Sequence, residues 1–153
     1  MRRTAVTRRQ LLIASAGAVV GAALPFGPVA TARAADARSL TPMQHYVLRC
    51  GGTEPPGSHP LNAERRRGDY ACAGCGAVLF ASAARLPGGG WPGFAAPISA
   101  AVQIVSDDSD GLARDVAMCR CCNGHLGHVA TDAASPSGRR WHINGAALHF
   151  LPL

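Results

Sequence analysis

Four cysteines in two Cys-x-x-Cys pairs carry the clearest chemistry in this sequence of 153 residues. Cys72 and Cys75 form the first pair, and Cys119 and Cys122 repeat the same spacing much further along the chain. Two such turns can direct four thiolates towards one tetrahedral metal ion, and a site closed by four thiolates is structural. The spacing therefore predicts a structural zinc site. A redox disulfide within one pair, or two structural disulfides, are the alternatives in an oxidising compartment.

A histidine stands in an alternating, mostly apolar run near the end of the chain, GRRWHINGAALHF, residues 138–150. Residues two apart in a strand point to the same face, so Arg140, His142 and Asn144 are expected to lie side by side. Imidazole can transfer protons or bind a metal. It can equally fill space and hydrogen-bond Asn144 or a backbone carbonyl, so the role of His142 depends on what surrounds it.

Two further cysteines lie outside the predicted zinc site. Cys121 stands between two expected ligands, where its side chain is expected to point away from the metal, and Cys50 follows a short apolar stretch. We interpret both as partly buried thiols and not as nucleophiles.

The positive charge of the chain is concentrated at its N-terminus. The formal net charge is +6, but residues 1–34 contain five arginines and no acid, whereas residues 35–153 contain ten arginines and nine acids. The body of the protein is therefore nearly neutral, which argues against a nucleic-acid partner.

Residues 1–34 have the pattern of a twin-arginine-type export signal. The basic front ends in Arg8 and Arg9, an apolar stretch begins at Leu11, and small residues suitable for cleavage stand at Ala32 and Ala34. A spanning helix or a basic tail are the alternatives, and the prolines at 25 and 28 argue against the helix. We expect an exported, periplasmic or extracellular domain, residues 35–153, that meets the membrane only during export and is a monomer.

The elements that must position these residues are mostly short strands. Thr41 and Pro42 predict the start of one short helix, residues 51–62 are a loop, and AERRRGD, residues 63–69, is expected to be a solvated helical turn without a function. Apolar and β-branched runs predict strands in five segments: 70–80, 96–105, 111–119, 124–131 and 139–150. This pattern predicts a compact antiparallel β domain with small helices at its front.

Five motifs together resemble the peptide methionine-R-sulfoxide reductases. They are LTPMQHYVLRCGGTEPP, CAGCGAVLF, GGGWPGF, CRCCNGHLGHV and GRRWHINGAALHF, in the family's order and from about Leu40 to Pro152. The resemblance implies a mainly β, β-tent-like fold of two antiparallel sheets with short N-terminal helices. It also implies a structural zinc held by Cys72, Cys75, Cys119 and Cys122.

The resemblance also implies a substrate, methionine-R-sulfoxide in a protein or peptide, and a site for it. In that family a cysteine thiolate attacks the sulfoxide sulfur, and the resulting sulfenic acid is resolved by a second thiol. Trp91 would form an apolar wall for the S-methyl group, with Phe94 nearby. The polar residues that would orient water, bind the sulfoxide oxygen and tune the nucleophile are His125, His128, Asp132, Arg140 and Asn144.

The sequence departs from the family at the reacting sulfur. His142 occupies the position of the catalytic cysteine, and Gly89 occupies a common resolving position. Gly145 replaces a serine, and residues 130–131 replace Phe-Asp. Imidazole has no oxidation states that accept the sulfoxide oxygen and return by thiol exchange, so turnover by the family mechanism is not expected.

Three functional hypotheses follow. The first is a reductase that is slow or has moved its nucleophile to Cys121. The second is a module that binds methionine sulfoxide without reducing it. The third is an added metal site formed by His125, His128 and His142, with Asp132 as an orienting group or fourth ligand, where zinc, copper or iron would keep an open position.

Overall fold

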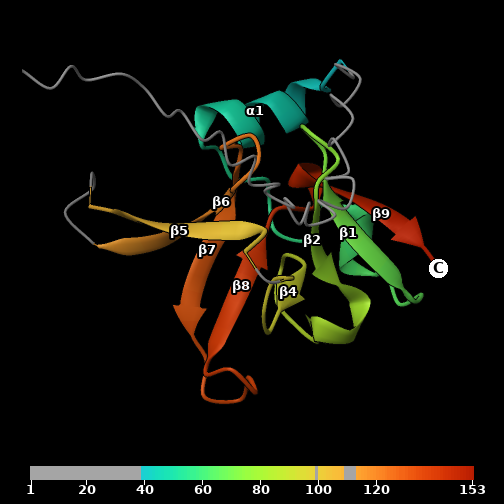
Figure 1. Cartoon of the computed structure of the whole chain (residues 1–153), viewed down its shortest axis with the longest axis vertical. Coiled ribbons are helices and arrows are strands. Elements are labelled where there is room, and N and C mark those ends of the chain that lie inside the picture. The colour runs from blue at the N-terminus through green and yellow to red at the C-terminus, as the bar shows by residue number, and fades with distance from the viewer. Residues whose placement is uncertain (1–38, 99, 109–112) are drawn as a thin grey trace, which may run out of the picture.

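The computed structural model describes residues 39–98, 100–108 and 113–153 (Figure 1). The export signal expected at residues 1–34 lies outside the described residues. Within the described ranges, no helix combines the length and the apolar character needed to cross a membrane.

The described residues contain nine strands. They form two antiparallel sheets, as expected from the sequence (Figure 1). The three-stranded sheet has the order β2-β1-β9, with β1 at Gly68–Cys72, β2 at Val78–Ala81 and β9 at Leu148–Pro152. The six-stranded sheet has the order β3-β4-β8-β7-β6-β5. Its strands are β3 Arg85–Leu86, β4 Gly93–Phe94, β5 Val102–Asp107, β6 Arg114–Cys119, β7 His125–Thr131 and β8 Arg139–Ile143.

One α-helix, α1 at Pro42–Cys50, begins where the sequence predicted (Figure 1). The Thr41 side chain accepts a hydrogen bond from the Gln44 backbone N–H, and the Gln44 side chain accepts one from the Thr41 N–H. These reciprocal bonds satisfy two N–H groups that the first turn leaves free. In the part of the chain that the structure describes, three short 3-10 turns complete the helical content: η1 Pro60–Asn62, η2 Ser82–Ala84 and η3 Gly145–Ala147.

Aromatic side chains from both sheets form the core. The Phe80 ring from β2 stacks on the Phe94 ring from β4 with centroids 4.3 Å apart, and Tyr70 meets Phe94 edge-on at 4.9 Å. Trp141 and Ile143 from β8 are buried against the same cluster. Burial of each large apolar side chain stabilises the fold by about 1.5–3 kcal/mol. This cluster therefore fixes the position of β8 and determines which face of that strand points outward.

The segment 139–150 is two strands and not the single strand expected from its alternating pattern. β8 ends at Ile143 in the six-stranded sheet, η3 follows, and β9 joins the other sheet. The Glu54 carboxylate accepts hydrogen bonds from the backbone N–H groups of Gly145 (2.6 Å) and Ala146 (2.9 Å), which removes these groups from a sheet ladder. Asn144 therefore lies beyond the strand, and only Arg140 and His142 share its outer face.

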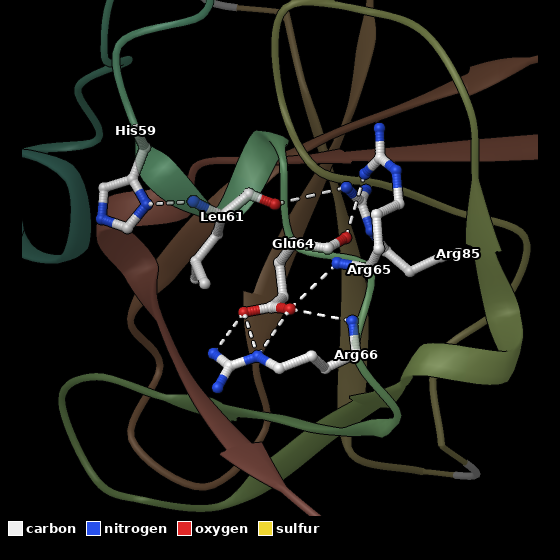
Figure 2. A network of polar contacts seen from close by, with 6 residues as sticks. All are labelled: His59, Leu61, Glu64, Arg65, Arg66 and Arg85. Atoms are coloured by element: carbon white, nitrogen blue, oxygen red, sulfur yellow. Dashed lines mark hydrogen bonds and ion pairs between the residues drawn. The ribbon is translucent and has the colours of Figure 1, made fainter.

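The segment 63–69 forms no helical turn, which corrects the expectation for AERRRGD. The Glu64 carboxylate accepts hydrogen bonds from the backbone N–H groups of Arg65 and Arg66, both at 2.9 Å, and from the Arg66 guanidinium at 2.6 Å (Figure 2). These local bonds compete with helical ones and hold a bend that leads into β1.

Candidate functional site

The two Cys-x-x-Cys pairs meet in one cluster. Cys72 ends β1 and Cys75 lies in the turn after it, and Cys119 and Cys122 occupy the corresponding positions at the end of β6 and in the turn that follows. The four sulfur atoms lie within 4.8 Å of one another, with Sγ–Sγ distances of 3.7 Å for Cys72–Cys122 and for Cys75–Cys119. Sulfurs bonded to zinc at about 2.3 Å in a tetrahedron are about 3.8 Å apart. The cluster therefore fits a structural zinc ion.

The electrostatics of the cluster favour a bound cation. The Cys119 neighbour raises the pKa of Cys72 well above its ordinary value, and burial raises the pKa of Cys75 to about 12. The hydrogen bond from Cys72 lowers the pKa of Cys119 to about 5. The thiolate of Cys119 thus forms at the expense of its neighbours Cys72 and Cys75, and a cation among the sulfurs would favour their ionisation.

All six cysteines are within the described residues, and none of them forms a disulfide. Cys121 is exposed although it stands between two members of the cluster, as expected. Cys50 is exposed at the end of α1, where its sulfur lies 3.9 Å from Nδ1 of His45. The expectation that these two thiols are partly buried is therefore wrong.

His142 belongs to a row of directly opposed residues across the outer face of the six-stranded sheet. Gly93 of β4 pairs with His142 on one side, and His128 of β7 pairs with it on the other. The row continues through Val116 on β6 to Val105 on β5. Directly opposed residues point to the same face, so the His128 and His142 rings are neighbours.

Close approach of β7 and β8 behind this row depends on a glycine. A Cβ atom on Gly127 would lie only 2.0 Å from the carbonyl oxygen of His142, and the φ of Gly127 is 156°. No other residue type fits there without movement of a strand.

The three imidazoles of the site form a chain. The His125 and His128 rings meet edge-on with centroids 5.6 Å apart, and His125 Nδ1 lies 3.2 Å from the carbonyl oxygen of Val47 in α1. Burial lowers the pKa of His125, His128 and His142 below the ordinary value, and for His142 the positive charge of Arg140 lowers it further. All three rings are therefore neutral at neutral pH.

Asp132 and Arg140 form an ion pair beside His142. Nε of Arg140 donates to Oδ2 of Asp132 at 2.6 Å, and Nη1 donates to the Pro87 carbonyl at 3.1 Å. The hydrogen bond from Arg140 lowers the pKa of Asp132, which keeps this carboxylate charged. The pair brings the loop that contains Pro87 to the edge of the site.

The loop before β4 reaches the same place. A Cβ atom built on Gly89 would lie 4.0 Å from Nδ1 of His142. Trp91 is held by a hydrogen bond of 2.9 Å from its Nε1–H to the Glu54 carbonyl oxygen. The Pro92 carbonyl accepts a hydrogen bond from the Ile143 N–H, which fixes this loop to β8.

Glu54 is the site residue that sequence reasoning missed. It is only 2% exposed, and its backbone N–H donates to Oδ1 of Asn144 at 3.0 Å. Its carbonyl holds Trp91 and its carboxylate holds the turn that follows Asn144. Nothing in the loop sequence GGTEPP signals burial of a carboxylate, because the groups that it binds lie about ninety residues away.

Asn144 and Phe94 are placed behind the outer face. Asn144 is buried, and its Nδ2 donates to the Leu126 carbonyl at 3.0 Å. Phe94 is fully buried in the core, where it packs on Phe80 and Tyr70. The structure therefore brings Arg140, His142 and His128 together on one face but places Phe94 on the other.

A cavity of about 380 Å³ adjoins the histidines, between the end of α1 and the outer face of the sheet. Its lining includes Leu48, Gly51, Val116, Met118, His125 and His128. Arg49, Asp107 and Asn123 share this lining, and the mixture of apolar and polar groups suits a ligand that has both.

Comparison with known proteins identifies relatives of the whole described domain. The SelR domain family matches residues 40–152. The peptide methionine sulfoxide reductase MsrB of Bradyrhizobium diazoefficiens is 45% identical over 117 residues, which cover 75% of this chain and 84% of that protein. The MsrB proteins of Leptospira interrogans and Pseudomonas entomophila are 43% and 44% identical over 115 residues, 74% of this chain and 88% of each relative.

Proposed function

Because the chain belongs to the peptide methionine-R-sulfoxide reductase family, we propose that it binds methionine-R-sulfoxide in proteins or peptides without reducing it through residue 142. The binding face is the outer row around His142 and the adjoining cavity. Residues 35–153 form this domain, and the zinc cluster stabilises it.

One observation carries the proposal. A Cβ atom on Gly89 would lie 4.0 Å from the His142 ring, so the two positions assigned to the nucleophilic and resolving sulfurs face each other. An imidazole and a hydrogen atom occupy them. The sulfoxide oxygen can leave as water only when a thiol supplies the electrons, and neither position has one.

The residues that remain are suited to binding. Trp91, fixed by Glu54, offers an apolar wall to the S-methyl group. The neutral rings of His128 and His142 each offer one N–H donor to the sulfoxide oxygen. Because Arg140 pairs with Asp132, that carboxylate is not free to repel the oxygen.

Calorimetry tests this proposal. The full chain should bind a peptide that contains methionine-R-sulfoxide more tightly than the same peptide with methionine or with the S-sulfoxide. Trp91→Ala should weaken binding of the R-sulfoxide about tenfold, the loss expected for one aromatic contact. Absence of heat with every sulfoxide peptide, or equal affinity for the unoxidised peptide, would refute the proposal.

A second candidate function is metal binding by the three histidines, favoured by the neutral state that burial imposes on their rings. Neutral imidazole is the form that ligates zinc, copper or iron, and Asp132 would orient His142 or act as a fourth ligand. Among the described residues, the four cysteines are the group of metal-binding side chains whose ligand atoms all lie within 4.8 Å of one another. The three histidines do not form such a group, so their rings would have to turn to share an ion. Two metal ions per chain, falling to one in His142→Ala, would support this candidate, and one ion in both would refute it.

We also propose that residues 1–34 direct twin-arginine export and that the mature domain is a periplasmic or extracellular monomer. The pair Arg8-Arg9 and the small residues at Ala32 and Ala34 support this proposal. Arg8→Lys combined with Arg9→Lys should retain the precursor inside the cell, and light scattering of the secreted form should give the mass of one chain. Unchanged secretion of the double variant would contradict the route.

A further inference from the structure

The cavity beside the histidines extends past the proposed position of the sulfoxide towards the edge of the sheet. Val105 of β5, Val116 of β6 and His128 of β7 lie in one row with His142 of β8, across four neighbouring strands. Neighbouring strands are about 4.8 Å apart, so Val116 lies about 10 Å along this row from His142. His128, Val116 and Val105 all line the cavity. The cavity therefore continues the proposed sulfoxide site over the next two strands.

The least exposed part of the lining is apolar. Apart from the two histidines, the buried and half-buried lining residues are Leu48 at the end of α1, Val116, and Met118 of β6. Val105 extends this apolar surface to the edge strand, where 47% of the residue is exposed. A ligand side chain that lay here would remove apolar surface from water on both partners, which favours binding in proportion to the area buried.

The polar residues of the lining are exposed, and together they do not select a charged ligand. Nη1 of Arg49 donates to the Cys122 carbonyl at 3.5 Å. Oδ1 of Asn123 accepts a hydrogen bond from Nε2 of Gln103 at 2.9 Å. The lining contains one cation, Arg49, and one anion, Asp107, so the two charges offset each other. Its apolar side chains are therefore the groups that distinguish one ligand from another.

The size and the position of the cavity fit a side chain of the same peptide that contains the sulfoxide. A cavity of about 150 Å³ can hold benzene, so the 380 Å³ found here is large enough for a branched or aromatic side chain. In an extended peptide, side chains on one face recur about every 7 Å. The residue two positions from a methionine sulfoxide at His142 would therefore lie over His128 and Val116, where the apolar surface begins.

We propose that this cavity receives the side chain of the residue two positions from the methionine sulfoxide in a substrate peptide, and that it favours a large apolar side chain there. This preference rests on the proposed binding function and adds a sequence requirement to it. Oxidised methionines in apolar segments are bound more tightly than those beside charged residues.

Calorimetry on the unmodified full chain tests the preference. Three peptides each contain one methionine-R-sulfoxide and carry glycine, leucine or aspartate at both positions that lie two residues away from it. The leucine peptide should bind about tenfold more tightly than the glycine peptide, because one leucine side chain becomes partly buried. Equal affinities of these two peptides, or tightest binding of the aspartate peptide, would overturn the preference but leave the proposed function intact. Absence of binding by all three peptides would refute both.

Two neighbouring residues of β5 provide matched variants for the position of the cavity. Val105 lines the cavity on the outer face, whereas Ile104 is the next residue along the strand and points to the opposite face. Their exposed fractions are similar, 47% and 37%. Val105→Asp should abolish the preference for leucine, because the apolar side chain would have to desolvate a carboxylate. Ile104→Asp should keep the preference. A preference that survives in Val105→Asp, or that is lost equally in both variants, would overturn the assignment of this cavity.

Discussion

At the scale of single residues, the site depends on what His142 touches and on what Glu54 holds. His142 lies between Gly93 and His128 on the outer face, and its neutral ring faces the position of Gly89. Glu54 approaches from behind the sheet and links Trp91 to Asn144. His142 determines the chemistry of the site, and Glu54 determines its shape.

Glu54→Gln should reduce the free energy of unfolding by about 2 kcal/mol, because an amide NH₂ would face a backbone N–H at Gly145 or Ala146 and leave it unpaired. It should also weaken binding of the sulfoxide peptide, since the turn after Asn144 and the Trp91 loop are held by the same residue. Chemical denaturation and calorimetry measure the two effects. Glu64→Gln is the matched control and should leave peptide binding unchanged, and equal affinity of both variants would contradict the positioning role.

At the scale of elements, β7 and β8 form the site because their backbones approach closely at Gly127. Gly127→Ala should destabilise the fold by about 3 kcal/mol or more, because the added Cβ would overlap the carbonyl oxygen of His142. Gly57→Ala is the control, since Gly57 also has a positive φ but nothing lies within 4 Å of its Cβ direction. The expected loss of unfolding free energy in Gly57→Ala is about 1 kcal/mol. Similar denaturation midpoints of the two variants would contradict the packing argument.

The histidines on β7 and β8 couple stability to pH. Burial lowers the pKa of His128 and His142 in the folded state, whereas the unfolded chain keeps a value near 6.5. Between these values the unfolded state binds more protons, so the free energy of unfolding falls as the pH decreases below about 6.5. Denaturation across this range should show a shallower fall in His142→Asn than in the control His45→Asn. Identical slopes would contradict the burial of the His142 ring.

Much of this element structure follows from local pattern. The cap at Thr41 and the paired cysteines depend on residues close in sequence, and the structure confirms them. Strands occur in all five expected segments, but residues 70–80 contain two strands, β1 and β2, separated by the turn that holds Cys75. The division of residues 139–150 into β8 and β9 could not be predicted, because the break is made by the distant Glu54 carboxylate. The core position of Phe94 is likewise set by pairing with β8 and not by its motif.

At the scale of the whole molecule, the cysteine cluster joins the ends of strands from both sheets, β1 and β6. The purified protein should contain one zinc ion in this cluster. Cys72→Ser should lose that ion and about 3 kcal/mol or more of stability, because metal binding contributes directly to folding. Cys121→Ser is the matched control and should keep the metal, since its thiol lies outside the cluster. Loss of zinc in Cys121→Ser, with retention in Cys72→Ser, would contradict the ligand assignment.

The most direct test of the account is a reductase assay on the natural protein and on His142→Cys, with methionine-R-sulfoxide as substrate and excess dithiothreitol. We expect no turnover in the natural protein and measurable turnover in His142→Cys, because the variant restores an oxidisable sulfur to an otherwise formed site. Turnover in the natural protein would contradict the account, and Cys50→Ser and Cys121→Ser would then show which thiol acts. Silence of both proteins would contradict the claim that only the sulfur is missing.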